Sequence, residues 1–212
     1  VLSMTFSVSR RGVLGFLAVA STGLAPVSAA WAAQDSRAFI QSFGDQLVAI
    51  VNSPLSLADK KEKIMPLVSK NVDIDGIGRY CLGRFWKVAT PEQQKHYLVL
   101  FHQILANAIA DKLGDYRGVS FTIGNVTKSG DDDSVEATLV RPQQPPAAMQ
   151  WLVNSSSGSP KVVDVIGEGA SLRLTQRNDY SSFIARNGGD VDTLLRALQK
   201  QIDHHNAASA QQ

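Results

Sequence analysis

The chain has 212 residues, with 21 lysine and arginine residues against 19 aspartate and glutamate residues, for a formal net charge of +2. This near balance argues against a strongly basic nucleic-acid-binding protein. The chain contains one cysteine, which excludes a disulfide framework within it. The length and the 44% hydrophobic content fit one globular domain or at most two small ones.

Residues 1–32 have the pattern of a cleaved export signal. Arg10 and Arg11 precede an apolar run over 13–20, and Ala30-Trp31-Ala32 is a small-x-small cleavage motif. An uncleaved anchor is the alternative, but the run is short and rich in small residues. The paired arginines resemble a twin-arginine signal, so we expect export, which in a bacterium means the periplasm. The segment contains no acidic residue, so the +2 charge belongs to it and the rest of the chain is neutral.

We expect one α+β domain over 33–205, followed by a disordered tail over 206–212. Apolar residues at spacings of three and four predict helices. These helices cover 35–51, a stretch after Ser56 that includes 64–68, 73–82, 90–113, 174–185 and 190–204. Pro66 predicts a kink or an end near Met65 in the second of them.

The helix that starts after Thr90 has the strongest local signal. Thr90 is a typical N-cap residue, Pro91 suits the first helical position, and Gln93 completes a capping box. The apolar stripe of this helix is wide, so it needs a broad apolar surface to cover it.

Alternating apolar residues then predict four consecutive strands, centred on 119–123, 135–139, 149–153 and 162–166. Short connections between them, such as the exposed hairpin at 130–133, predict an antiparallel meander. Because alternation means that one face is covered, we expect the long helix to lie on the sheet.

The sequence offers few groups for catalysis. It has no His-Glu-x-x-His, Gly-x-Ser-x-Gly or glycine-rich phosphate motif, so we predict no catalytic residues, no metal site and no cofactor. Cys81 is interpreted as a buried apolar residue. Asp164 and Glu168 flank a glycine turn, where a structural role is favoured over an acid–base pair.

Apolar surface is what the sequence does offer, and it could line a cavity between the sheet and a helix layer or fill a solid core. The candidate lining residues lie on the long helix and on the strands. They are Phe101, Ile104, Leu105, Ala108, Ile109, Phe121, Ile123, Leu139, Met149, Trp151, Val163 and Val165.

Several segments together resemble the MlaC-type periplasmic lipid carriers of the toluene-tolerance family, auxiliary components of ABC transporters. The resemblance spans Phe39 to Ile202 and is carried by 75–86, 90–94, 163–172, 176–180 and 187–189. The sequence Thr175-Gln176-Arg177 and the proline-rich segment before Trp151 look more like the hopanoid-associated branch of this family.

The resemblance implies a monomeric lipid carrier that holds apolar chains between sheet and helices. Its implied partners are a phospholipid or hopanoid, an inner-membrane ABC transporter complex and an outer-membrane lipoprotein complex. Arg177 is the candidate for the cavity mouth or for a partner contact, unless it makes a structural bond to Asp164, Glu168 or a helix-end carbonyl.

Two other classes of function stay open on the sequence. One is an isomerase-like or hydratase-like enzyme on a cone-shaped α+β scaffold, with Asp164 or Glu168 as a base in an apolar pocket. The other is an adaptor whose apolar groove binds a partner helix. The candidate inward strand positions are all apolar, which favours binding over catalysis.

Overall fold

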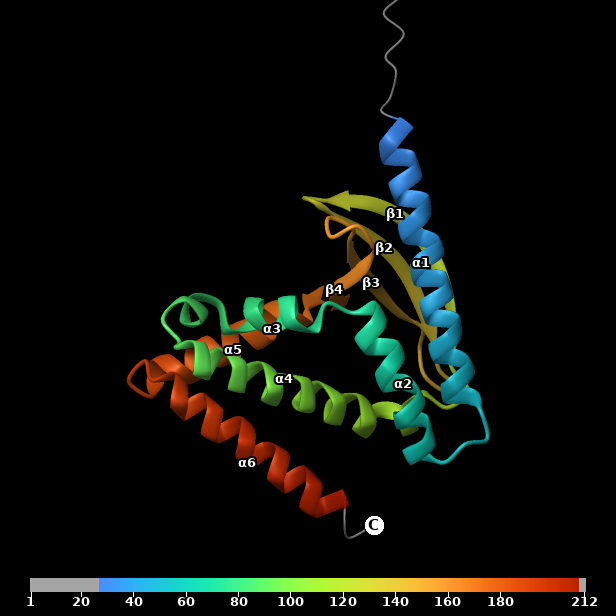
Figure 1. The fold of residues 1–212 in the computed structure, drawn as a ribbon. Coiled ribbons are helices and arrows are strands. Elements are labelled where there is room, and N and C mark those ends of the chain that lie inside the picture. Colours follow the sequence, from blue (N-terminus) through green and yellow to red (C-terminus); the bar gives the residue numbers. More distant parts are fainter. Residues whose placement is uncertain (1–26, 210–212) are drawn as a thin grey trace, which may run out of the picture.

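A computed structural model describes residues 27–209, so most of the predicted export signal lies outside the described residues. Six α-helices, two short 3-10 helices and five strands form one mixed α+β domain (Figure 1). The elements are α1 (Val27–Asn52), α2 (Leu57–Asn71), α3 (Ile74–Leu82), η1 (Gly83–Lys87), α4 (Pro91–Lys112), η2 (Leu113–Tyr116), β1 (Ser120–Ser129), β2 (Asp132–Val140), β3 (Ala147–Asn154), β4 (Lys161–Gly167), β5 (Ala170–Ser171), α5 (Leu172–Arg186) and α6 (Val191–Ser209).

The capping box predicted for the long helix is confirmed. The Thr90 side chain accepts a hydrogen bond from the Gln93 amide at 3.2 Å, and the Gln93 side chain accepts one from the Thr90 amide at 3.0 Å. Ser56, Asp73 and Ser171 cap α2, α3 and α5 in the same way, with one side-chain acceptor each. Local sequence therefore sets most helix starts.

Three helix boundaries differ from the prediction. α2 does not end near Met65 but continues through Pro66 to Asn71, because Val68 beyond the proline is 5% exposed and packs in the core. Such packing outweighs the backbone hydrogen bond that a proline removes. α1 begins at Val27, before the expected start, and α6 continues to Ser209, beyond the expected end at 204.

The sheet is an antiparallel meander in the order β1-β2-β3-β4-β5, so the four predicted strands are confirmed and a fifth is added. β5 has two residues and pairs back onto the end of β4. The turn between them places Glu168 and Gly169 at φ values of 52° and 80°. A glycine is suited to this left-handed conformation, and it lets the chain reverse within two residues.

The sheet departs from regular pairing near both of its edges. In β1, Gly124 and Asn125 together face Glu136, which makes a bulge, and Arg37 of α1 donates hydrogen bonds to the carbonyls of Ile123 and Gly124. Beside β4, Val72 forms a short parallel bridge with Val162, and the amide of Asp73 donates to the Val162 carbonyl at 2.9 Å.

The helix that covers the sheet is α1, and the expectation that α4 would cover it is wrong. α1 runs along β1 and β2, whereas α4 packs between α3 and α6 (Figure 1). The stripe of α4 is occupied by these helices: the Tyr97 hydroxyl donates to the Gly78 carbonyl at 2.9 Å, and Gln93 donates to Asp192 of α6 at 2.9 Å.

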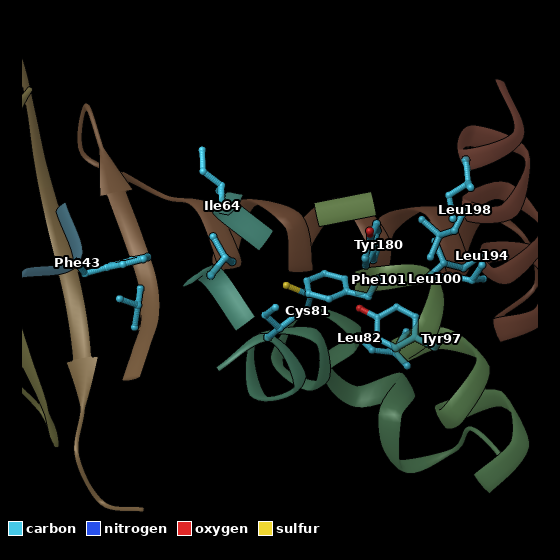
Figure 2. Packing of buried hydrophobic residues seen from close by; sticks show 14 of the residues in the cluster. Phe43, Ile64, Cys81, Leu82, Tyr97, Leu100, Phe101, Tyr180, Leu194 and Leu198 are labelled. Carbon is cyan, nitrogen blue, oxygen red and sulfur yellow. The ribbon is translucent and has the colours of Figure 1, made fainter. Parts of the chain in front are cut away.

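The core accordingly has a sheet part and a helix part. Figure 2 shows Phe43 of α1 directed at the sheet, and a separate group around Tyr97 where α3, α4, α5 and α6 meet, with Ile64 of α2 between them. Tyr97 is fully buried and lies against Trp86, Phe101 and Tyr180 at ring-centroid distances of 6.4, 5.8 and 6.2 Å.

The predicted hairpin at 130–133 is shorter than expected. Asp132 and Asp133 belong to β2, and Asp133 is buried rather than solvated. Its carboxylate accepts a hydrogen bond from the Ser36 hydroxyl at 2.6 Å and lies 2.6 Å from the Lys128 ammonium. The aspartate therefore holds Ser36 of α1 against the sheet.

Candidate functional site

Strand residues of the candidate site share one face of the sheet. Phe121 pairs with Leu139, and Trp151 pairs with Val165. Residues that face each other across antiparallel strands point to the same side, and alternate residues along each strand share that side. Ile123 and Met149 lie on the same face, because each of them pairs with Ala137 on β2, the strand between β1 and β3.

α1 lies very close to this face. Phe43 meets Trp151 edge-on at 5.8 Å between ring centroids, and Phe121 meets the same indole at 6.3 Å. Gly44 of α1 sits directly against the Phe121 ring, in the space that a Cβ atom would need. Glycine at this position therefore lets the helix approach the sheet.

Val163 is the one candidate strand residue placed differently. The register between β3 and β4 shifts between Leu152 and Val153, whose partners are Asp164 and Val162. Val163 is the extra residue at this shift, and it is half-buried without packing on the main core. A bulge cannot be read from an alternating pattern, which predicts regular pairing.

Candidate residues on α4 change their surroundings along the helix. Tyr97, Phe101 and Ala108 lie along one side of it, since the last is about three turns from the first. Tyr97 and Phe101 are 0% and 6% exposed beneath α3, whereas Ala108 is exposed. The apolar side of α4 is therefore closed at its N-terminal half and open at its C-terminal half.

Partial burial is the property that most candidate residues share. Phe101 and Ile123 are buried, while eight others are half-buried and pack on the core. These eight are Ile104, Leu105, Ile109, Phe121, Leu139, Met149, Trp151 and Val165. The sheet face and the open side of α4 thus each present accessible apolar surface. α2 contacts both α1, which covers the sheet face, and α4.

Arg177 lies elsewhere, in a surface groove of about 320 Å³ between η1 and α5. The groove is lined by Arg84, Arg177, Ser181, Ser182 and Ala185. The Arg177 guanidinium stacks on the Tyr80 ring at 4.9 Å and lies against Gly83, whose φ of 59° favours glycine. Within residues 27–209, neither arginine of the groove has a carboxylate within 4 Å.

The structural ion pair considered for Arg177 is made by Arg173, a residue that the sequence interpretation missed. Arg173 Nε lies 3.5 Å from Asp164, and its guanidinium stacks on Tyr80 at 4.6 Å. Asp164 is 3% exposed and also accepts hydrogen bonds from the Ser171 hydroxyl at 2.5 Å and the Arg173 amide at 3.1 Å. This carboxylate joins the middle of β4 to the start of α5.

The contacts of Asp164 decide whether it could act with Glu168 as an acid–base pair. Asp164 is occupied by its structural partners, while Glu168 is exposed in the turn between β4 and β5. Among the residues that the structure describes, no three His, Cys, Asp or Glu side chains are grouped so as to hold a metal ion. No described helix is both long and apolar enough to span a membrane.

Cys81 is a buried residue, as predicted, with 1% of its surface exposed. Burial raises the pKa of its thiol from 9.0 to about 12; Asp164 raises it further, and Arg173 and Arg177 oppose the rise. Because the folded-state pKa is raised, this neutral thiol contributes stability that is complete below about pH 9 and is lost as pH rises toward 12.

We therefore expect Cys81→Ala to flatten the alkaline loss of stability. Between about pH 8 and pH 10.5, the wild type should lose about 1–2 kcal/mol more than the variant in urea unfolding, followed by circular dichroism. The small cavity left by the variant lowers the free energy of unfolding at every pH. Only the dependence of that free energy on pH therefore tests the ionisation of the thiol. Identical slopes for both proteins would contradict this assignment.

The fold and these surfaces define a single α+β domain with an open antiparallel sheet and half-exposed apolar faces on two layers. A family model described as MlaC protein matches residues 41–200. The chain therefore belongs to the MlaC family.

Two relatives show how far this likeness extends. The intermembrane phospholipid transport system binding protein MlaC of Haemophilus influenzae is 20% identical over 171 residues, covering 76% of this chain and 79% of the relative. A phospholipid-binding protein from Ralstonia solanacearum, solved in complex with a phospholipid, matches with a TM-score of 0.71 at 24% identity. That match covers 81% of this chain and 99% of the solved one, and it supports the fold.

Proposed function

We propose that this protein binds a phospholipid and carries it between membranes. Family membership supports the proposal, since the Haemophilus relative is named for intermembrane phospholipid transport and the Ralstonia protein was solved with a phospholipid. The observation that carries it in this chain is accessible apolar surface on two layers, along the sheet face and the open side of α4.

The acyl chains would lie between these two surfaces. Each buried methylene contributes about 0.8 kcal/mol, so two chains can be held tightly without any catalytic group. Chains that enter there would cover Ala108 and its half-buried neighbours on α4 and the sheet residues around Trp151. The cavity predicted between sheet and helices would be the space that the lipid occupies.

The finer features of the proposal come from the sequence. Residues 1–32 would direct export to the periplasm by the twin-arginine route, and the neutral domain would act there as a monomer. Its partners would be an inner-membrane ABC transporter complex and an outer-membrane lipoprotein complex. A hopanoid is the alternative ligand.

The groove at Arg177 would bind an anionic group. Two guanidinium groups that have no carboxylate partner among residues 27–209 lie beside two serine hydroxyls, and stacking on Tyr80 holds Arg177 in place. Arginine is suited to phosphate and carboxylate groups because its planar fork donates two parallel hydrogen bonds. The anion would be a lipid phosphate or an acidic side chain of a membrane partner.

Binding accounts for the site better than catalysis does. The enzyme alternative needs a free ionisable group among the apolar residues, but Asp164 is engaged by Ser171 and Arg173. The adaptor alternative needs no lipid at all.

Lipid carried through purification separates these functions. The full chain should be expressed in a bacterium, purified from the periplasm without detergent and examined by native mass spectrometry. We expect a mass increment equal to one phospholipid, which organic extraction releases and chromatography identifies. A protein that leaves cells empty and takes up no lipid from phosphatidylglycerol vesicles would refute the proposal and favour an adaptor.

A further inference from the structure

Trp151 carries a buried hydrogen-bond donor with no acceptor in the part of the chain that the structure describes. Its indole Nε1 is inaccessible to solvent and makes no hydrogen bond, although the residue as a whole is half-buried. Buried donors are nearly always paired, because an unpaired one loses its hydrogen bonds to water and gains nothing in return.

The neighbours of Trp151 explain why the donor is unpaired. Val135 and Val165 flank it on the adjacent strands. Phe43 and Phe121 meet its ring edge-on at 5.8 and 6.3 Å. All four side chains are hydrocarbon, so the only partner they offer the N–H group is the weak acceptor face of an aromatic ring.

A well-packed core would favour phenylalanine here, which fills the same kind of space without a polar atom. Tryptophan is useful at a site that is apolar at one end and polar at the other, since its N–H group can meet a polar ligand atom. The position of this donor within the proposed lipid site is therefore informative about the ligand.

We propose that the Trp151 indole N–H donates a hydrogen bond to an acyl ester carbonyl of the bound lipid. This inference rests on the proposed lipid-binding function and identifies the chemical group of the lipid that the site recognises. Phe43 is 2% exposed and Phe121 lies against Gly44, so the carbonyl reaches the indole only when lipid entry moves one of these rings aside. The ester group then lies at Trp151, and the methylene chains cover the remaining apolar surface.

The inference separates ester-linked lipids from other apolar ligands. A diacyl phospholipid presents two carbonyl oxygens where its chains begin. A dialkyl ether phospholipid presents only weak ether acceptors, and the fused rings of a hopanoid present none. Such ligands leave the Trp151 donor unpaired in the complex, and a site built to donate a hydrogen bond rejects ligands that cannot accept it.

The test compares two probes on two proteins. Wild type and Trp151→Phe, both stripped of lipid, are titrated with diacyl phosphatidylglycerol and with its dialkyl ether analogue of equal chain length. One neutral hydrogen bond corresponds to a preference of about 3- to 10-fold, so we expect the wild type to favour the ester by this factor and the variant to bind both equally. Trp86→Phe is the matched control, because Trp86 packs on Tyr97 in the helix part of the core, and it should keep the ester preference.

A spectroscopic readout on the same samples locates the hydrogen bond. The indole N–H signal missing from Trp151→Phe is assigned to Trp151, and in wild type it should move downfield with ester lipid and stay in place with ether lipid. Equal affinities of wild type for the two lipids, or an ester preference that survives Trp151→Phe, would overturn the inference. If neither lipid binds to wild type, the proposed function itself fails, which is a different result.

Discussion

Replacing Asp164 with Ala should cost about 3–5 kcal/mol of stability, the largest effect we expect from a single substitution outside the aromatic core. The variant leaves the Arg173 guanidinium without its buried partner and removes the acceptor of the Ser171 hydroxyl and the Arg173 amide. For a domain of this size, the midpoint of thermal unfolding should fall by about 6–20 °C.

Urea unfolding followed by circular dichroism measures the loss. Asp179→Asn is the matched control, since Asp179 lies on α5, the helix that Asp164 holds, and its exposed side chain makes no hydrogen bond or ion pair with the described residues. Its stability should stay within about 0.5 kcal/mol of wild type. A loss below about 1 kcal/mol in Asp164→Ala would show that this junction does not hold β4 and α5 together.

Replacing Ala108 with Trp should abolish most lipid binding without unfolding the protein. Ala108 is exposed on the open apolar side of α4, so an indole there has room in the empty protein and occupies the space proposed for an acyl chain. We expect affinity for phosphatidylglycerol to fall about tenfold or more, equivalent to 1.4 kcal/mol or more.

Val99→Trp is the control for this experiment. Val99 is 58% exposed and lies about two and a half turns from Ala108, hence on the opposite side of the same helix. Lipid co-purified with each variant, counted by native mass spectrometry, should be lost from Ala108→Trp and retained in Val99→Trp. Equal retention by both would place the acyl chains away from α4.

Features with local causes could be predicted from the sequence. The α4 capping box needs only Thr90 and Gln93, and the alternation of Phe121 with Ile123 places both on one face of the sheet. The family resemblance, the α+β class and the antiparallel meander also follow from patterns within the sequence. Each of these depends on residues near one another in the chain or on a repeated spacing.

Features decided by contacts between distant segments could not be predicted. An apolar stripe does not say what will cover it, so the pattern predicts α4 on the sheet, although α3 and α6 cover its apolar side. Asp133 looked solvated because its partner Ser36 is 97 residues away. The sequence does not single out Arg173, because spacing along the chain does not show that this arginine reaches Asp164.

The irregularities near the two edges of the sheet have a consequence for self-association. An open sheet can pair with another copy through the unpaired amides and carbonyls of an edge strand. In β1 the bulge at Gly124 interrupts the regular ladder, and Arg37 already occupies two of its carbonyls. Beside β4, the short β5 and the bridge from Val72 cover the other edge. Neither edge offers a long straight template for a second chain, so the domain can expose an apolar face to its ligand while its sheet edges resist stacking into aggregates.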